Sequence, residues 1–420
     1  MGSNRNSGFK WDIRSIGMLT AGSILSQSII FITTLCIAKL YKPEEFGSYA
    51  VIISIANLIS PFLTLSKEIF IVPIESNQKA FNLLREIYRT FCINLSILVV
   101  ITFIFLSQKN RFEILQNVTN LEVIFSIVLA ILFALHLIFQ QIFLRSEAFK
   151  VIAMRGPIQS FGVGIFQVIL GFYRVLSNAL VVGEVVGRLT LIGINLRYVK
   201  RIILNWKNEV HTVSKERETE KNHHFANFIS ILFDLLCISL ALISASLFYG
   251  EYYSGQISMS LRIAALPTIL IGAAFSQYIL AHGSSRHREL GRMTSTTYRS
   301  ILVKLIPISL IFSLFLFIVG EWLVTPLLGE SWELSGEILK MLAPLFFVGF
   351  VWAPVSSLFY VNHMWVLFLK VTALRLVLML CSVLISQLVG FSFEGMIFLV
   401  YFASAIVQVI GMNNLRHTFA

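Results

Sequence analysis

Apolar stretches of about 20 residues follow one another along almost the whole chain, and lysines and arginines gather on every second connection between them. An α-helix rising 1.5 Å per residue needs about 20 apolar residues to cross a hydrocarbon core about 30 Å thick. The pattern therefore predicts an all-α polytopic membrane protein with about 12 transmembrane helices. The predicted spans are 15–38, 48–72, 90–107, 121–144, 151–172, 176–198, 226–249, 255–281, 300–320, 336–360, 363–388 and 393–413.

The positions of the 33 Lys and Arg residues predict the orientation of the spans. If the N-terminus is cytoplasmic, most of these residues fall on inside segments, including 145–155 and the Lys370–Arg375 segment. Short loops rich in Lys and Arg stay on the cytoplasmic side, so both termini are expected there. The net charge of +11 then matches an anionic inner membrane surface, with membrane lipids as partners, and does not require nucleic acid.

The composition leaves little room for catalytic chemistry. Hydrophobic residues make up 56% of the chain and charged residues 13%, which is too apolar for a soluble protein of this length. The four cysteines lie in apolar runs, where packing is the simpler role. The sequence has no G-x-x-x-x-G-K-[ST], G-x-S-x-G or H-E-x-x-H motif. We therefore predict a protein that is not an enzyme, with no catalytic residue, no metal and no cofactor.

A polar segment near the middle divides the chain into two halves. We expect a six-helix bundle over 1–205, a cytoplasmic linker over 206–225 and a second six-helix bundle over 226–420. Because each half has an even number of spans, both start on the inside and run in the same direction. Two such bundles facing each other are expected to enclose a central cleft that opens to each side in turn.

A short match supports an internal repeat. Tyr41 and Gly47 open the second span with the same spacing that separates Tyr249 from Gly255 at the eighth, 208 positions later. At that offset Arg262 takes the place that Ser54 has in the first half.

Arg262 is the main candidate for a residue that binds substrate in the cleft. A charge at mid-membrane costs about 2.5–3.5 kcal/mol, so it is expected to face the cleft or a partner. No acidic residue lies one turn away on the same helix. We expect a cation lining the cleft, and the alternative is a salt bridge to Asp234 or Glu184.

Four other polar residues within spans are further candidates for the cleft. Arg188 follows Glu184 by four residues, so the two side chains share a helical face and are expected to form a structural pair. Asp234 either binds a coupling proton or Na⁺ or pairs with Arg262 or Arg188. Gln27 lies mid-span, where a hydrogen-bonded packing role is the commoner one.

Three residues near the ends of spans are candidates for a gate or for ion coupling. Lys67 and Glu68 lie at the inner end of the long second span. Lys67 can snorkel to the interface, and Glu68 either caps a gate or sits at the interface. Lys39 lies at the outer mouth, where an anchoring role is the simpler account. Trp322 and Trp332, in an outside connection, fit the aromatic belt, and stacking on a sugar is the alternative.

Several of these segments resemble one known family. The run GQISMSLRIAALPTILIG over 255–272 resembles the eighth helix of bacterial Wzx-type flippases of the multidrug/oligosaccharidyl-lipid/polysaccharide (MOP) exporter superfamily. The segment Leu328-Gly-Glu-Ser-Trp332 is similar to the same family's stretch leading into the tenth helix, and Pro43-Glu-Glu-Phe-Gly47 is similar to its usual opening.

The resemblance implies a specific function. A flippase of this kind moves a polyprenyl-pyrophosphate-linked oligosaccharide from the cytoplasmic to the periplasmic leaflet of the bacterial inner membrane. The product would serve the synthesis of O-antigen, capsule or exopolysaccharide, with other polysaccharide-assembly membrane proteins as possible partners. A cationic cleft is typical of such flippases, and Arg262 is the position that fits. The lipid tail would stay in the bilayer, reached through a lateral opening between the first and eighth helices.

Two other readings remain. A cation-coupled multidrug exporter of the same superfamily would be expected to carry paired carboxylates and a cleft suited to cations. A membrane-embedded polysaccharide polymerase or acyltransferase would be expected to show a sizeable outside loop or a His/Asp catalytic pair, and the sequence has neither.

Overall fold

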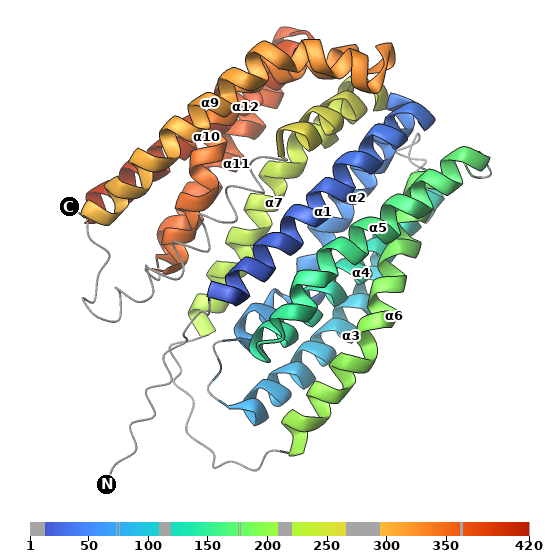
Figure 1. Cartoon of the computed structure of the whole chain (residues 1–420), viewed down its shortest axis with the longest axis vertical. Coiled ribbons are helices and arrows are strands. Elements are labelled where there is room, and N and C mark those ends of the chain that lie inside the picture. Colours follow the sequence, from blue (N-terminus) through green and yellow to red (C-terminus); the bar gives the residue numbers. More distant parts are fainter. Residues whose placement is uncertain are drawn as a thin grey trace.

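The computed structural model describes residues 13–108 except 73 and 75, 119–208 except 175 and 177, 221–265, 295–361 and 364–419. These residues form helices and no strands (Figure 1). The helices are α1 (Ile13–Leu40), α2 (Pro43–Thr64), η1 (Lys67–Ile71), α3 (Asn77–Gln108), α4 (Asn120–Arg145), α5 (Phe149–Tyr173), α6 (Ala179–Asn208), α7 (Lys221–Tyr249), a helix over 251–265, α9 (Ser295–Leu328), η5 (Glu330–Trp332), α10 (Glu333–Val361), α11 (Trp365–Val389) and α12 (Phe393–Phe419).

Within the described residues, 11 helices are long and apolar enough to cross a membrane. They correspond to eleven of the predicted spans, so the all-α polytopic fold is confirmed. The remaining span, the eighth, predicted over 255–281, is helical as far as residue 265, and the rest of it lies outside the described residues.

The second span is shorter than its apolar sequence indicates. The prediction of a continuous span over 48–72 is wrong, because Leu65 and Ser66 both have φ of 52° and end α2. Left-handed residues at this position are a common way to terminate a helix. The short helix η1 follows, and the carbonyl oxygen of Ile71 at its end accepts a hydrogen bond of 3.0 Å from the Arg145 side chain. The chain therefore turns before the region that holds Lys67 and Glu68.

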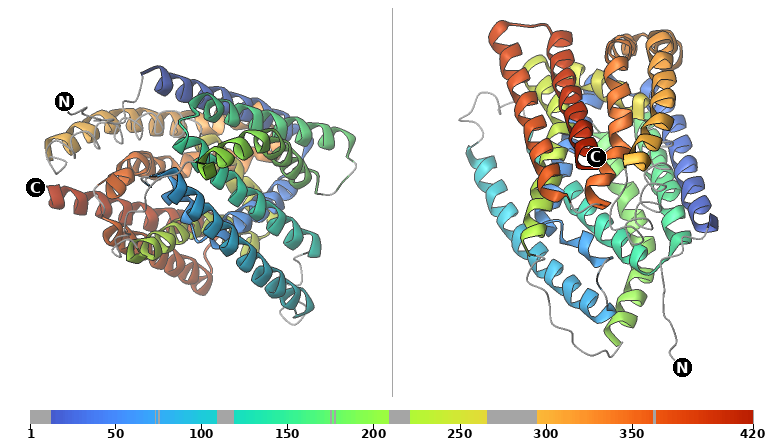
Figure 2. Two further views of the ribbon diagram at one scale, coloured as in Figure 1. Left: turned by 90° about the horizontal axis from the view of Figure 1, so that it is seen from below. Right: turned by 90° about the vertical axis from the view of Figure 1, so that its left-hand side faces the viewer.

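The helices group into two halves along the chain. In the first half, α1 packs on α5, α5 on α6, and α2 on α4; in the second, α9 packs on α10, and α11 packs on α7 and α12. Helix α7 also packs along α2, so these two helices join the halves (Figures 1 and 2). Helices α6 and α7 occupy both ends of the predicted 206–225 linker, and residues 209–220 lie outside the described part.

The two halves meet closely at the end of the molecule where α1 ends and α2 begins, here called the distal end. A Cβ atom on Gly47 would lie 1.9 Å from the carbonyl oxygen of Glu251, and one on Gly255 would lie 1.9 Å from that of Pro43. Only glycine allows backbones to approach this closely. At the offset of 208 residues Pro43 corresponds to Glu251 and Gly47 corresponds to Gly255, so the two contacts are equivalent to each other. This symmetry supports the internal repeat.

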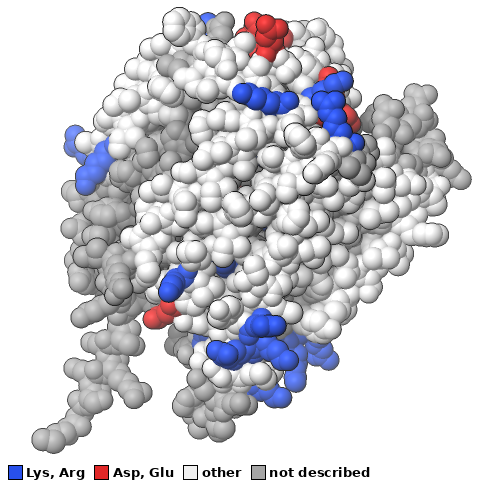
Figure 3. Space-filling view, turned by 45° about the vertical axis from the view of Figure 1, so that its right-hand side comes forward, with Lys and Arg blue, Asp and Glu red and all other residues white. Residues whose placement is uncertain are grey.

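The outer surface is apolar between two charged ends. On the face seen in Figure 3, most Lys, Arg, Asp and Glu side chains gather toward the ends, with a broad band of other residues between them. Phe103 on α3 is 74% exposed and Trp322 on α9 is 85% exposed. Such surfaces suit contact with lipid rather than water, in agreement with the membrane assignment.

Candidate functional site

Arg262 reaches from the 251–265 helix of the second half onto α1 and α2 of the first. Its guanidinium carbon lies 4.8 Å from the centre of the Phe46 ring and 6.0 Å from that of Tyr49. One guanidinium nitrogen donates to Thr34 Oγ1 over 3.4 Å. A cation held over aromatic faces keeps part of its electrostatic stabilisation without a counter-ion. Arg262 therefore lies at the boundary between the two halves.

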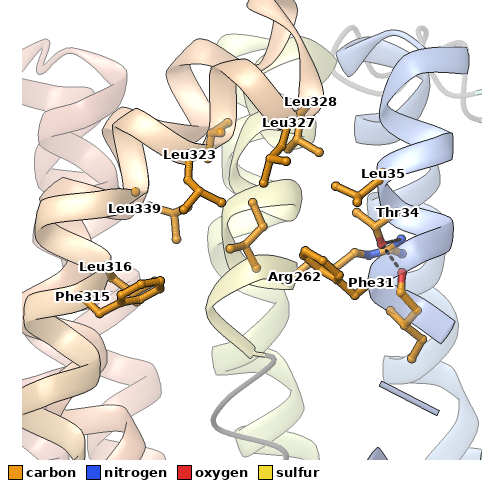
Figure 4. A pocket seen from close by; sticks show the side chains of 14 residues that line it. Phe31, Thr34, Leu35, Arg262, Phe315, Leu316, Leu323, Leu327, Leu328 and Leu339 are labelled. Carbon is orange, nitrogen blue, oxygen red and sulfur yellow. Dashed lines mark hydrogen bonds between the residues drawn. The ribbon is translucent and has the colours of Figure 1, made fainter. Parts of the chain in front are cut away.

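An apolar cavity of about 60 Å³ lies next to this guanidinium. Figure 4 shows its wall, which is built from α1, the 251–265 helix, α9 and α10. Leucine, isoleucine, valine and phenylalanine side chains make up most of the lining, and Arg262 is the charged residue among them. Thr34 and Leu35 close the α1 side, and Leu327 and Leu339 lie opposite. The site thus combines one cation with a hydrocarbon-like wall.

Arg188 and Glu184 form the predicted ion pair on α6. Glu184 also accepts a hydrogen bond of 2.9 Å from the Tyr49 hydroxyl, and the Arg188 guanidinium lies 4.2 Å from the centre of the Phe133 ring. Because Tyr49 touches both Glu184 and Arg262, the structure brings three of the predicted site residues close to one side chain of α2. The alternative of a direct salt bridge between Arg262 and Glu184 is not what the structure has.

Asp234 belongs to a separate cluster in the second half. Its carboxylate pairs with Arg375 at 3.0 Å, and Arg375 also donates to Ser404 Oγ at 2.8 Å. Pairing was one of the two roles considered for Asp234, but the predicted partners Arg262 and Arg188 were wrong. Arg375 was assigned to an inside segment by the charge pattern, whereas it lies well inside α11 and is mostly buried.

Among the described residues, Arg262 forms no hydrogen bond or ring contact with the gate and coupling candidates or with Gln27. Lys67 pairs with Glu86 of α3 at 2.6 Å. Glu68 is only 3% exposed, one of its oxygens has no hydrogen-bond partner among the described residues, and burial raises the pKa of its carboxyl. Lys39 is exposed at the distal end of α1. Gln27 is half-buried on α1 and makes no hydrogen bond within the described part of the chain.

Sequence reasoning missed the aromatic partners of Arg262. Phe46 is fully buried and Tyr49 is 6% exposed, and they lie three and six residues after the Pro43 that opens α2. Their spacing of three residues places them on one helical face, which is the only signal that the sequence offered. Of the two tryptophans predicted for the aromatic belt, Trp322 is exposed as that role requires, whereas Trp332 is fully buried and its assignment was wrong.

Arg155 was also missed. The charge pattern placed it in the inside connection 145–155, but it lies within α5 and is 5% exposed. Its guanidinium donates to the backbone carbonyl of His136 at 3.1 Å and lies 5.3 Å from the centre of the Phe143 ring. Arg155 therefore ties α5 to α4 inside the first half.

Comparisons with known proteins identify a family and a fold. The family model described as "Polysaccharide biosynthesis protein" matches residues 36–337. No curated protein sequence gives a significant match. Solved structures with the same fold are a mutant of the Vibrio cholerae MATE transporter VcmN, at 10% identity, 96% coverage of both chains and TM-score 0.57, and the lipid II flippase MurJ in an inward closed conformation, at 11% identity, coverage of 94% of this chain and 86% of the other, and TM-score 0.63.

A third structure is a MOP superfamily transporter from Pyrococcus furiosus, described as having a binding pocket of reverse polarity that suggests a different function. It shares 13% identity over 97% of this chain and 95% of the other, with TM-score 0.56. At these identities the likeness to the three structures establishes the fold alone.

Proposed function

Because this chain belongs to the polysaccharide biosynthesis protein family, we propose that it is a flippase for lipid-linked oligosaccharides. It moves a polyprenyl-pyrophosphate-linked repeat unit from the cytoplasmic to the periplasmic leaflet of the bacterial inner membrane by alternating access. The product serves synthesis of a surface polysaccharide such as O-antigen, capsule or exopolysaccharide. The observation that carries the proposal is the position of Arg262, between the two halves and beside an apolar cavity.

The chemistry of this site matches the two parts of such a substrate. A guanidinium forms short, charge-assisted hydrogen bonds with phosphate oxygens. The adjoining wall of leucine, isoleucine and phenylalanine side chains suits a prenyl chain close to the headgroup. The sugar units would occupy the space between the halves, while the rest of the tail stays in lipid.

The membrane potential supplies a driving force without a nucleotide. A cell interior that is 100 mV negative favours outward movement of an anion by about 2.3 kcal/mol per charge. A pyrophosphate headgroup with two charges would gain roughly twice that amount.

The charges within the spans favour this proposal over a cation-coupled multidrug exporter. Among the described residues, Glu184 is paired with Arg188 on the same helix, and Asp234 is paired with Arg375 on α11. Neither is therefore free to hold a cationic drug without losing its arginine partner. A basic pocket attracts anions, whereas a multidrug exporter of this kind must bind cations.

Replacement of Arg262 tests the proposal. In a strain that lacks the gene, Arg262→Ala should fail to restore surface polysaccharide, and lipid-linked intermediates should accumulate on the cytoplasmic leaflet. Arg197→Ala, on an exposed face of α6, is the control and should restore both to the wild-type level. Normal polysaccharide from Arg262→Ala at matched protein levels would refute the role of Arg262. Unchanged intermediates in the deletion strain would refute the flippase itself.

A further inference from the structure

Four residues hold the two halves together at the distal end, and we call them the distal clasp: Phe46, Gly47, Gly255 and Trp332. The glycines allow the close backbone crossing described above. Trp332 comes from η5 of the second half, and its indole N–H donates to the carbonyl oxygen of Ala38 on α1 at 2.9 Å. Its ring meets the Phe46 ring edge-on, with centres 5.6 Å apart and planes at 85°.

Phe46 belongs both to the clasp and to the Arg262 site. The ring that contacts Trp332 also carries the Arg262 guanidinium at 4.8 Å from its centre. Phe46 and Trp332 are fully buried, whereas Arg262 is half-buried, so its contact with the Phe46 ring is partly shielded from water. Cation–π attraction strengthens as the partners lose contact with water. The closed distal end therefore draws part of its stability from the charge of the residue that we assign to substrate binding.

An anion would compete for the same guanidinium. Hydrogen bonds from arginine to phosphate are directional and form in the plane of the guanidinium, whereas the contact with Phe46 uses its face. A phosphate that orients Arg262 toward itself, and neutralises its charge, weakens the attraction to the ring. The loss falls on the closed state alone, because Phe46 and Arg262 belong to different halves.

We propose that Phe46 couples substrate binding to opening of the distal clasp: an anionic headgroup that engages Arg262 withdraws the guanidinium from the Phe46 ring and thereby loosens the contact with Trp332. This inference rests on the proposed function, and it makes Phe46 a positioning residue rather than one that touches the headgroup. Opening is then favoured when Arg262 is occupied and disfavoured when it is empty.

The distance between the halves at the distal end can be measured directly. Lys42 at the start of α2 and Glu330 in η5 are exposed and lie on opposite halves. We would place spin labels on Lys42→Cys and Glu330→Cys in the full chain, with its four native cysteines replaced by serine. Pulsed electron paramagnetic resonance in liposomes then measures the distance between the two labels. Undecaprenyl pyrophosphate is the probe, and undecaprenol, which lacks the phosphates, is the control ligand.

In the otherwise unchanged protein, undecaprenyl pyrophosphate should shift the population toward the longer distance and undecaprenol should not. Phe46→Leu should raise the open-to-closed ratio about fivefold without ligand, which is the effect of losing one buried cation–π contact, and should abolish the response to the probe. Phe359→Leu is the matched control, because Phe359 is equally buried and packs on Trp352 within the second half. It should leave both the ratio and the response unchanged.

A second variant guards against misfolding. Trp332→Phe keeps a ring against Phe46 but loses the hydrogen bond to Ala38. It should open the distal end partly and still respond to the probe.

The outcomes separate the coupling from the proposed function. If the unaltered protein binds undecaprenyl pyrophosphate by native mass spectrometry but Phe46→Leu responds to it like the parent, the coupling is wrong and the flippase proposal stands. Binding without any change of distance in the parent also overturns the coupling. If the parent binds neither this probe nor any pyrophosphate-linked lipid, the proposed function fails first.

Discussion

At the scale of single residues, the charges inside the spans are stabilised in two different ways. Glu184 and Asp234 are neutralised by arginines. Glu184 also accepts a hydrogen bond from the Tyr49 hydroxyl, and Arg375, the partner of Asp234, donates one to Ser404 Oγ. Arg262 instead rests on aromatic rings and a hydroxyl, and no carboxylate in the described residues lies within salt-bridge distance of it. A cation that is stabilised without a counter-ion stays available to an anionic ligand.

The Asp234–Arg375 pair predicts a measurable rescue. Arg375→Met should leave an uncompensated carboxylate and lower the free energy of unfolding by about 1–3 kcal/mol, less than for a fully buried pair because Asp234 is partly exposed. Adding Asp234→Asn should recover most of the loss, as followed by thermal unfolding in detergent. If the double variant is no more stable than the single one, the pair is not the source of the effect.

Glu68 predicts a dependence of stability on pH. Since burial raises the pKa of its carboxyl in the folded protein, folding favours the protonated form. The contribution of Glu68 to stability is full below the ordinary glutamate pKa and is lost as pH rises through the raised value.

Glu68→Gln should therefore be more stable than the wild type above the raised pKa. The difference in melting temperature should shrink as pH falls toward the ordinary glutamate value. The same substitution at Glu394, which is exposed near the start of α12, serves as the control for loss of charge. Equal melting temperatures of Glu68→Gln and wild type at every pH would contradict the prediction.

At the scale of elements, the distal crossing of α2 with the 251–265 helix depends on glycine. Gly255→Ala should prevent the closed distal end, because its Cβ would lie 1.9 Å from a backbone carbonyl that cannot move independently. The longer distance between labels at Lys42 and Glu330 should then dominate. Gly193→Ala on α6 meets nothing within 4 Å and should stabilise the helix by about 0.5–1 kcal/mol. A closed distal end in Gly255→Ala would show that the crossing is not needed.

The sequence predicted elements better than it predicted where they end. The length of the apolar runs located the spans, but it could not show that α2 stops at Thr64. Leu65 and Ser66 are not the glycine or asparagine that usually indicates a left-handed turn at the end of a helix. Arg155 was misplaced for a related reason. From sequence alone, a charged residue near the end of an apolar run is assigned to the neighbouring loop. Arg155 is instead buried within α5, where it donates to the backbone of His136. Contacts between helices decide such cases.

At the scale of the whole molecule, the orientation in the membrane remains a prediction from charge. With both termini cytoplasmic, a membrane-impermeant thiol reagent should label Lys39→Cys from outside in intact spheroplasts. Arg299→Cys, exposed near the start of α9, should react only after the membrane is opened. Both variants need a background without native cysteines. Labelling of Arg299→Cys in intact spheroplasts would reverse the orientation.

The candidate site was predictable only in part. Arg262 stood out because it is a charge in an apolar run, a property that a sequence displays directly. Its neighbours Phe46 and Thr34 lie more than 200 positions earlier and have nothing unusual in their own segments. Their role arises from the way in which the halves pack, as does that of Arg375 beside Asp234.

The paired glycine contacts have a consequence for how this chain can change over evolutionary time. Inserting one residue into a helix rotates everything beyond it by about 100°. An insertion between Pro43 and Gly47, or between Glu251 and Gly255, would turn one contact away while the other stayed in place. Loops can lengthen and lipid-facing positions can drift freely, but these two short segments must keep the same length and change together.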